Sequence, residues 1–434
     1  MQYYSTSGNA PKTSLQEAVV KGLAPDKGLY MPERIPMIPK AFFNNIGEMS
    51  LQDIAYVVAN TLFGDDIDSE TLKEIVNETL NFDIPLVKVE DNKYSLELFH
   101  GPTLAFKDVG ARFMARLLGY FNKKNGTKDV NVLVATSGDT GSAVANGFLG
   151  VPGVKVFVLY PKGKVSKIQE AQFTTLGQNI TALEISGTFD DCQALVKNAF
   201  MDAELNEKLQ LTSANSINVA RFLPQMFYYF YAYAQLAKMC QPLDNIVVSV
   251  PSGNFGNITA GLIGKRMGLP IKRFIAANNK NDIFYQYLLS GEYNPRPSIA
   301  TIANAMDVGA PSNFARILDL YGNSHDAIAS EISGCTYTDE QIAETLKETY
   351  KTTGYLLDPH GAVGYRSLLD GLKENEIGVF LETAHPAKFK ETVESIIEDE
   401  VAIPAKLAAF MKGPKSTVKL SSSFPSFKKY LMSL

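Results

Sequence analysis

Cysteine is scarce in this chain of 434 residues, and the charges of the two signs nearly balance. The three cysteines, Cys192, Cys240 and Cys335, are odd in number and far apart, which excludes a disulfide framework and a Cys-x-x-Cys metal motif. We therefore expect buried free thiols, no bound metal and a reducing, cytoplasmic location. The formal net charge of −5 excludes a strongly basic surface, so nucleic acid is not an expected partner.

Long uninterrupted hydrophobic runs are also missing. The longest apolar stretch, residues 222–239, is rich in aromatics but contains Pro224, Gln225 and Gln235. This composition predicts a buried core helix and not a membrane span. The first residues show no basic region followed by an apolar core, so no secretory signal is expected. The content of 45% hydrophobic and 20% charged residues is typical of a soluble globular protein with no membrane partner.

Two nucleotide-binding motifs, G-x-G-x-x-G and G-x-x-x-x-G-K-[ST], are absent. From about residue 130 the chain instead alternates β-branched apolar runs with helical patterns. This alternation predicts an α/β fold with parallel or mostly parallel sheets and helices on both faces. The expected strands lie at residues 130–135, 154–160, 180–185, 246–250, 273–277 and 378–381.

One lysine directly precedes a helical pattern. Val109, Phe113, Leu117 and Phe121 recur at steps of four, which predicts an amphipathic helix with Lys107 at or just before its first residue. A cation is disfavoured at a helix N-terminus, and in an apolar pocket the neutral amine becomes available to attack a carbonyl. The alternative interpretation is a surface lysine before an ordinary helix.

The residues that precede this lysine form a recognisable motif. Residues 98–108 read Leu-Phe-His-Gly-Pro-Thr-Leu-Ala-Phe-Lys-Asp. This segment resembles the cofactor-lysine segment of the tryptophan-synthase-like, pyridoxal-phosphate-dependent enzymes, and the threonine synthase family in particular. The resemblance implies that Lys107 is catalytic and forms an imine with pyridoxal 5'-phosphate (PLP).

A glycine-rich turn at residues 251–257 follows an expected strand and opens an expected helix. Glycine lets the backbone approach a ligand closely, and free N–H groups at a helix start can hold a phosphate, although similar turns occur in many α/β proteins. The resemblance implies that the cofactor phosphate is held by Gly253, Asn254, Phe255, Gly256 and Asn257.

A second turn of this kind, Ser-Gly-Asp-Thr-Gly, begins at Ser137. Its hydroxyl and N–H groups could hold a carboxylate, or Asp139 could simply cap a helix that starts at Ser142. The resemblance implies that Ser137, Gly138, Asp139 and Thr140 receive the substrate carboxylate. Many relatives have asparagine where this chain has Asp139, which leaves the protonation and role of this residue open.

Amide, hydroxyl and guanidinium groups gather before the aromatic stretch, at Asn215, Ser216 and Arg221. A guanidinium beside amide donors suits a phosphate monoester, but Arg221 could instead pair with a neighbour at a helix start. The resemblance assigns these three residues to the phosphate of the substrate, with Thr140 as a candidate fourth.

The last matching segment, Leu-Glu-Thr-Ala-His-Pro-Ala-Lys-Phe, occupies residues 381–389. It resembles a late signature of the threonine synthases, which implies that Thr383 hydrogen-bonds the pyridine nitrogen of the cofactor. A neutral hydroxyl does not hold that nitrogen protonated, so the cofactor would be a weaker electron sink than with a carboxylate partner. His385 by itself is more typical of a structural histidine.

The matching segments, from residue 98 to residue 389, follow one another in the same order as in the family. They imply a two-lobed fold like that of the tryptophan synthase β-subunit. The expected parts are an N-terminal extension (1–95), a larger PLP-binding domain (96–110 and 219–400), a smaller mobile domain (111–218) and a C-terminal tail (401–434). The extension resembles that of the longer, microbial and fungal type of the family, at residues 4–8 and 28–32. Phe424 and Phe427 are expected to pack the tail as a simple chain end.

The implied activity is that of a PLP-dependent carbon–oxygen lyase acting on phosphate. It would eliminate the γ-phosphate of O-phospho-L-homoserine and add water at Cβ, giving L-threonine in amino-acid biosynthesis. Two alternatives stay open at this point: a serine or threonine dehydratase, and a non-catalytic protein that binds a phosphorylated ligand. Both a monomer and a homodimer are compatible with the sequence.

Overall fold

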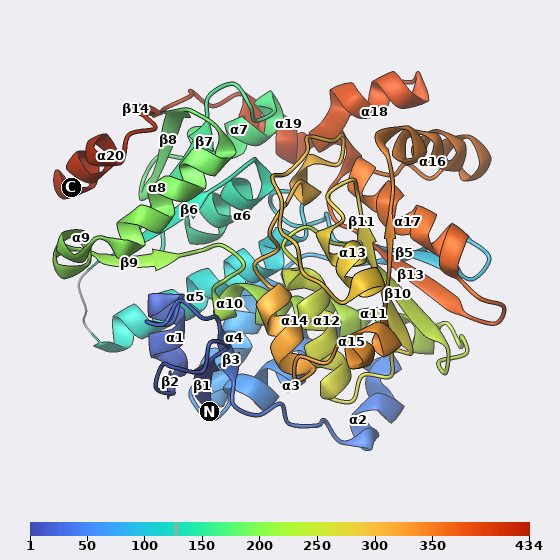
Figure 1. Ribbon diagram of the computed structural model, residues 1–434. Coiled ribbons are helices and arrows are strands. Elements are labelled where there is room, and N and C mark those ends of the chain that lie inside the picture. The colour runs from blue at the N-terminus through green and yellow to red at the C-terminus, as the bar shows by residue number, and fades with distance from the viewer. Residues whose placement is uncertain (126–128) are drawn as a thin grey trace. The chain divides into compact units, whose positions relative to one another are not determined.

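The computed structural model describes residues 1–125 and 129–434, and the chain forms two compact units (Figure 1). The first unit contains Met1, Met31–Phe106 and Phe222–Ala402, and the second contains Gln2–Tyr30, Lys107–Arg221 and Ile403–Leu434. In the described residues, no helix has the length and the apolar character that a membrane crossing requires.

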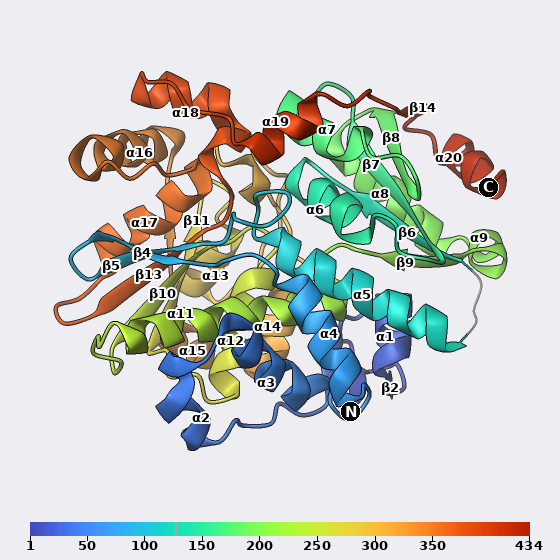
Figure 2. The same ribbon diagram turned by 180° about the vertical axis from the view of Figure 1, so that it is seen from behind.

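The first unit is built on a six-stranded sheet with the order β12-β11-β10-β13-β5-β4 (Figure 2). Five neighbouring strands run parallel, and only β4 is antiparallel to its neighbour β5. The strands are β4 (Leu86–Glu90), β5 (Lys93–Glu97), β10 (Ile246–Pro251), β11 (Arg273–Asn278), β12 (Ile332–Thr336) and β13 (Ile377–Glu382).

Helices cover both faces of this sheet. Ser249 on β10 donates a hydrogen bond to the carbonyl of Gly364 in α17, whereas Gly261 in α12 packs against Phe274, which projects from the opposite face of β11. The helices of the unit are α2 (Lys40–Asn45), α3 (Leu51–Phe63), α4 (Ser69–Thr79), α11 (Met226–Lys238), α12 (Gly256–Arg266), α13 (Ile283–Ser290), α14 (Phe314–Leu320), α15 (His325–Glu331), α16 (Asp339–Thr353), α17 (Pro359–Gly371) and α18 (Lys390–Ile397).

The second unit has a five-stranded, all-parallel sheet with the order β14-β8-β7-β6-β9. Its strands are β6 (Val130–Ala135), β7 (Val154–Pro161), β8 (Ile180–Ser186), β9 (Gln210–Ser213) and β14 (Val418–Ser421). A small sheet, in which β1 (Gln2–Ser5) pairs with β2 (Thr13–Ser14), also includes β3 (Tyr30–Pro32). Parallel sheets bordered by helices confirm the predicted fold class.

The helices of the second unit also lie on two faces of its sheet. Gly141 of α6 packs against Val158, whereas Leu133 and Phe157 point to the other face, where they form a core with Leu195 of α8. The helices are α1 (Leu15–Lys21), α5 (Lys107–Asn125), α6 (Asp139–Phe148), α7 (Lys167–Thr174), α8 (Phe189–Met201), α9 (Ala203–Lys208), α10 (Val219–Phe222, at the boundary of the units), α19 (Ala405–Met411) and α20 (Phe424–Met432).

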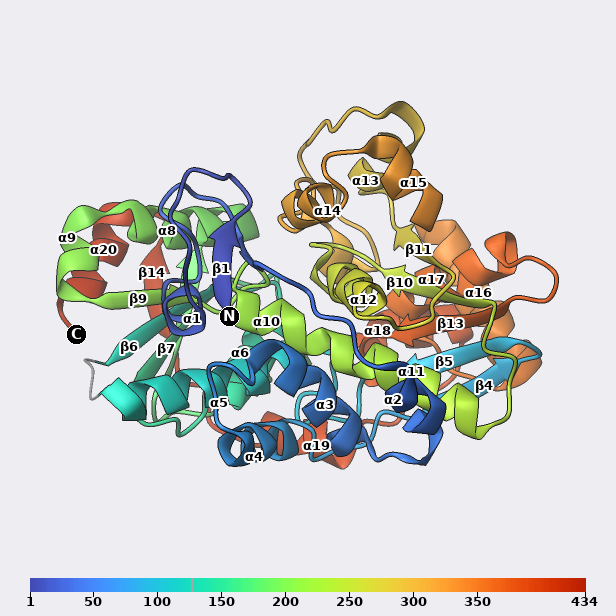
Figure 3. The ribbon, with the colours of Figure 1, turned by 90° about the horizontal axis from the view of Figure 1, so that it is seen from below.

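Three expectations need correction. The aromatic stretch is not one helix, because a 3-10 turn at Leu223–Gln225, which includes Pro224, separates α10 from α11. The tail is packed by aromatics as expected, with Phe427 of α20 fully buried beside α8, but it is more than a chain end, because β14 extends the second sheet (Figure 3). The cysteines are free, but Cys240 is exposed, so only part of the buried-thiol expectation holds.

Candidate active site at the carboxyl ends of the parallel strands

The segment that leads to Lys107 is joined by its backbone to the segment that follows β13. The N–H of Phe106 donates to the carbonyl of Thr383 over 2.8 Å, and the N–H of His385 donates to the carbonyl of Leu104 over 3.0 Å. Leu104 has a φ of 59°, a left-handed conformation that turns the chain into this pairing. Two of the predicted signatures, far apart in sequence, therefore lie side by side, and Lys107 begins α5 as its sequence pattern predicts.

A second lysine supports the same loop. Lys388 is 1% exposed, and its Nζ donates to the carbonyl oxygen of Thr103 over 2.8 Å. Burial of a cation requires hydrogen-bond acceptors, and this carbonyl supplies one of them. The sequence alone assigned no role to Lys388, because its acceptor lies 285 positions earlier in the chain.

The glycine-rich turn follows β10 and leads into the eleven-residue helix α12. Phe255 is left-handed at a φ of 63°, and a Cβ on Gly253 would lie 3.0 Å from the carbonyl oxygen of Ala305. The side chain of Asn257 fixes the turn by donating to the carbonyl of Pro251 over 2.8 Å. No protein acceptor within residues 1–125 and 129–434 receives the N–H groups from residue 253 to residue 257. This turn therefore fits an anion such as the phosphate of PLP.

The strand order brings these predicted cofactor residues to one edge. β10, β13 and β5 are successive parallel neighbours, so their carboxyl ends lie at the same edge of the sheet. The glycine-rich turn follows β10, Thr383 follows β13, and the segment ending at Phe106 follows β5. Ligands of open α/β sheets bind at this edge. Thr383 is buried, and Lys107, the residue after Phe106, is partly exposed.

The predicted carboxylate loop belongs to the second unit. The Oγ1 of Thr136 accepts the N–H groups of Gly138, over 2.9 Å, and Gly141, over 2.8 Å, which closes the turn after β6. The helix begins at Asp139, so the alternative in which this residue caps a helix from Ser142 is wrong. The buried carboxylate of Asp139 accepts a 2.9 Å hydrogen bond from the Nε2 of Gln169. Sequence reasoning missed Gln169, because nothing in its own segment marks it.

The residues predicted to hold the substrate phosphate follow the neighbouring strand, β9. The Nδ2 of Asn215 donates to the carbonyl of Ala135, at the end of β6, over 3.3 Å, so the loops after β6 and β9 adjoin. Arg221 is 2% exposed; burial lowers the pKa of its guanidinium to about 10, and the charge of Asp108 acts in the opposite direction. Ser216 lies in the same loop as Asn215.

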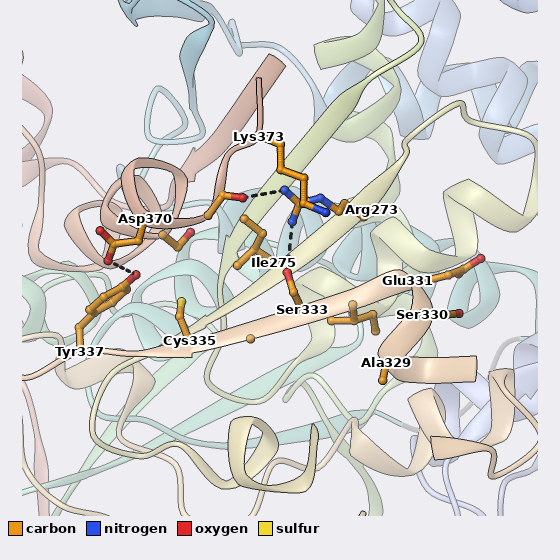
Figure 4. A pocket seen from close by; sticks show the side chains of 14 residues that line it. Arg273, Ile275, Ala329, Ser330, Glu331, Ser333, Cys335, Tyr337, Asp370 and Lys373 are labelled. Carbon is orange, nitrogen blue, oxygen red and sulfur yellow. Dashed lines mark hydrogen bonds between the residues drawn. The ribbon is translucent and has the colours of Figure 1, made fainter. Parts of the chain in front are cut away.

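A cavity of about 460 Å³ lies elsewhere in the first unit (Figure 4). Arg273 crosses it and donates to the Oγ of Ser333 over 3.3 Å, and Tyr337 donates to Asp370 over 2.9 Å. Polar groups that satisfy one another in this way leave little for a ligand to recognise. None of the predicted site residues lines this cavity.

Three protein-family models match the sequence, and together they cover most of it. Residues 85–381 match the model described as pyridoxal-phosphate dependent enzyme, and this range contains every predicted site residue except Thr383. Residues 2–80 match the model of the threonine synthase N terminus, and residues 361–431, which include Thr383, match that of the threonine synthase C-terminal part.

Individual proteins similar to this chain identify the family within this class of enzymes. The chain is 45% identical to the threonine synthase of Haemophilus influenzae and 44% identical to that of Escherichia coli, over all of this chain and at least 99% of each relative. Among solved structures, PLP-bound threonine synthase from Brucella melitensis superposes with a TM-score of 0.94 at 36% identity, covering 100% of this chain and 99% of that one. The chain belongs to the threonine synthase family.

More distant structures share the fold alone. A threonine deaminase from Solanum lycopersicum is 17% identical, with a TM-score of 0.54, and covers 76% of this chain. The full-length identity to threonine synthases is far higher, so the comparisons do not favour the dehydratase alternative.

Proposed function

We propose that this chain releases phosphate from O-phospho-L-homoserine and adds water at Cβ to give L-threonine, with PLP as its cofactor and the cytoplasm as its location. The observation that carries the proposal is the convergence of three predicted segments on one edge of the first sheet. The family membership reported above supports the same reaction.

The chain offers a fitting group for each part of the cofactor. The N–H groups of Gly253, Asn254, Phe255, Gly256 and Asn257 would hold the phosphate, because they sit at a helix N-terminus. The hydroxyl of Thr383 would meet the ring nitrogen, and Lys107 would hold the aldehyde carbon. When bound, PLP supplies an electron sink for negative charge on the substrate carbon that bears the amino group.

Lys107 is the group that moves protons. Its Nζ removes the proton from Cα of the substrate and then transfers protons at Cβ and Cγ, which one amine on a short tether can reach in turn. Its place at the first residue of α5 disfavours the ammonium form, which keeps the amine able to accept a proton.

The second unit would hold the two anionic ends of the substrate. Ser137, Gly138, Asp139 and Thr140 would receive the carboxylate at the N-terminus of α6, where the helix dipole favours negative charge. The bond from Gln169 occupies one oxygen of Asp139 and would turn that carboxylate away from the substrate.

The leaving phosphate would be stabilised by Arg221 together with Asn215, Ser216 and Thr140. A buried guanidinium binds a phosphate more strongly than an exposed one, because little water competes for its N–H groups.

The decisive experiment incubates the purified chain and PLP with O-phospho-L-homoserine and measures phosphate and threonine. The proposal predicts equal amounts of both products, and none with Lys107→Ala. Ammonia released from threonine, with no phosphate released from the phosphorylated substrate, would instead identify a dehydratase. A colourless protein that binds the substrate without turnover would identify a non-catalytic binder.

A further inference from the structure

A buried carboxyl group directly precedes one of the proposed cofactor residues in the chain. Glu382 is the last residue of β13, is 0% exposed and immediately precedes Thr383. Its backbone carbonyl accepts the N–H of Leu98 over 3.0 Å, and the carbonyl of Thr383 accepts the N–H of Phe106. Glu382 therefore stands where the backbone that leads to Lys107 is joined to the sheet.

The Glu382 side chain is held in one place by α17. Its Oε1 accepts the N–H of Asp358, the N-cap residue of α17, over 2.7 Å. A Cβ on Gly361 would lie 1.5 Å from its Oε2, so the helix packs directly on the carboxyl group. The side chain therefore connects the start of α17 to the end of β13.

No positive charge balances this carboxyl group. Within the described residues, no lysine, arginine or histidine forms an ion pair with Glu382, and its Oε2 has no hydrogen-bond donor. The adjacent His360 contacts Asp358 and not Glu382. Its Nε2 accepts the N–H of Ala305 over 3.1 Å, and its Nδ1 lies 2.6 Å from a carboxyl oxygen of Asp358.

The surroundings of Glu382 disfavour its charged form. Asp358 lies beside it; one carboxyl oxygen of Asp358 accepts the N–H of Gly361 over 2.7 Å, and the other lies 2.6 Å from the Nδ1 of His360. The Oε1 of Glu382 accepts the backbone N–H of Asp358, which is an uncharged donor. Burial first, and then the negative charge of Asp358, raise the pKa of the Glu382 carboxyl well above its usual range.

Other titratable groups gather around Glu97, which lies opposite Glu382 on the neighbouring strand. Glu97 on β5 accepts a 2.9 Å hydrogen bond from the hydroxyl of Tyr355, and its charge also disfavours ionisation of Glu382. The ring of His100 contacts Glu97 at 2.7 Å and is partly exposed to solvent.

We propose that Glu382 is a positioning residue for the reaction, an uncharged carboxylic acid that fixes Thr383 and the backbone leading to Lys107. An uncharged acid can be buried there without a counter-ion, whereas a carboxylate would add a negative charge next to the hydroxyl proposed to meet the cofactor ring. The kinetic part of this inference rests on the proposed function.

The test compares Glu382→Gln and Glu382→Ala with the wild type, each as the PLP-loaded protein. Glutamine keeps the shape, the lack of charge and the acceptor for Asp358, so its kcat is expected within about threefold of the wild type. Alanine removes the support, and kcat should fall about 10- to 100-fold while KM changes less, because the reacting groups are misplaced.

The matched control is Glu376→Gln, at the other end of β13. Glu376 is also buried, but it is paired with Arg273 and lies outside the site. This variant should lower Tm and leave kcat unchanged. If Glu382→Ala behaves in the same way, Glu382 is merely structural and the inference is wrong. If Glu382→Gln loses as much kcat as Glu382→Ala, the carboxyl group acts as an anion and the inference is also wrong.

A measurement without substrate keeps the test independent of the proposed function. A neutral folded Glu382 retains a proton that the unfolded chain releases above its ordinary pKa of 4.5. The wild type should therefore lose Tm relative to Glu382→Gln as the pH rises from about 5 to about 8, where each pH unit changes the unfolding equilibrium constant up to about tenfold. A Tm difference that stays constant across this range would overturn the uncharged state, even if Glu382→Ala does not fold.

Discussion

The two ends of strand β13 carry the same residue type in different surroundings. Glu376 directly precedes the strand and is 1% exposed, and Glu382 closes it and is 0% exposed. Burial alone would raise the pKa of Glu376, but hydrogen bonds from Arg273, from the N–H of Lys373 and from Lys272 lower it to about 2. Within the described residues no cation pairs with Glu382, and burial followed by the charge of Asp358 raises the pKa of its carboxyl group.

The two glutamates therefore differ in role: Glu376 contributes to stability, and Glu382 lies next to the proposed active-site residues. At the amino end, an ion pair of 2.6 Å with Arg273 ties β11 to β13 far from the cofactor residues. At the carboxyl end, parallel strands leave their loops free to bind ligands, and the buried acid there directly precedes Thr383, whose carbonyl accepts the N–H of Phe106. Changes at the carboxyl end should therefore alter turnover, and changes at the amino end should alter stability alone.

The largest effect is expected for Lys107→Ala. Loss of the only proposed proton carrier should lower the rate of phosphate release by about 10³-fold or more. The matched control is Lys272→Ala, which removes a lysine from the amino end of the sheet. Both rates are measured by phosphate release under saturating substrate. An equal loss of rate in the two variants would show that the carboxyl end of the sheet is no more important for turnover than the amino end.

The second-largest effect is expected for a steric change at the carboxyl end of β13. Gly361→Ala would place a methyl group 1.5 Å from the Oε2 of Glu382, and the forced movement should cost about 3 kcal/mol of stability and lower kcat as well. Gly371→Ala in the same helix meets its nearest atom, Cδ1 of Ile275, at an ordinary 3.7 Å. Denaturant unfolding of the two variants should show a loss for the first alone.

The ion pair at the amino end should contribute a smaller amount. Glu376→Gln leaves Arg273 and Lys272 without their carboxylate, and both cations reach solvent, so the loss should be about 1–2 kcal/mol. Unfolding midpoints measure the loss, and a parallel assay should find kcat unchanged. A reduced kcat would show that the amino end also shapes the site.

The smallest effect is a difference in pH profile between the two ends. The folded pKa of Glu376 is depressed, so its contribution is complete above an ordinary pKa of 4.5 and is lost as the pH falls towards about 2. The folded pKa of Glu382 is raised, so its contribution is complete below 4.5 and is lost as the pH rises. Compared with the wild type, Tm should depend less on pH below 4.5 in Glu376→Gln and less on pH above 4.5 in Glu382→Gln.

Much of this arrangement could be predicted from the sequence. The period-four pattern after Lys107 placed the start of α5, and the β-branched runs located strands whose ends carry the glycine-rich turns. These are local signals, because periodicity and turn chemistry act over a few residues. The break of the aromatic stretch at Leu223–Gln225 was also marked, by Pro224, but its apolar composition favoured one continuous helix.

The pairing of Asp358 with Glu382 could not be predicted in this way. Asp358 and Glu382 are 24 positions apart, and their contact depends on α17 packing against the end of β13. The bond between Gln169 and Asp139 spans 30 positions and has the same origin. Charge states set by such tertiary contacts leave no periodic trace in the sequence.

The proposed chemistry depends on the amine of Lys107, which would hold the cofactor at the carboxyl edge of the first sheet. Borohydride reduction of the PLP-loaded chain, followed by peptide mapping, tests it directly. A single pyridoxyl adduct is expected on Lys107, and none in Lys107→Ala. An adduct on a different lysine, such as the buried Lys388, would contradict it.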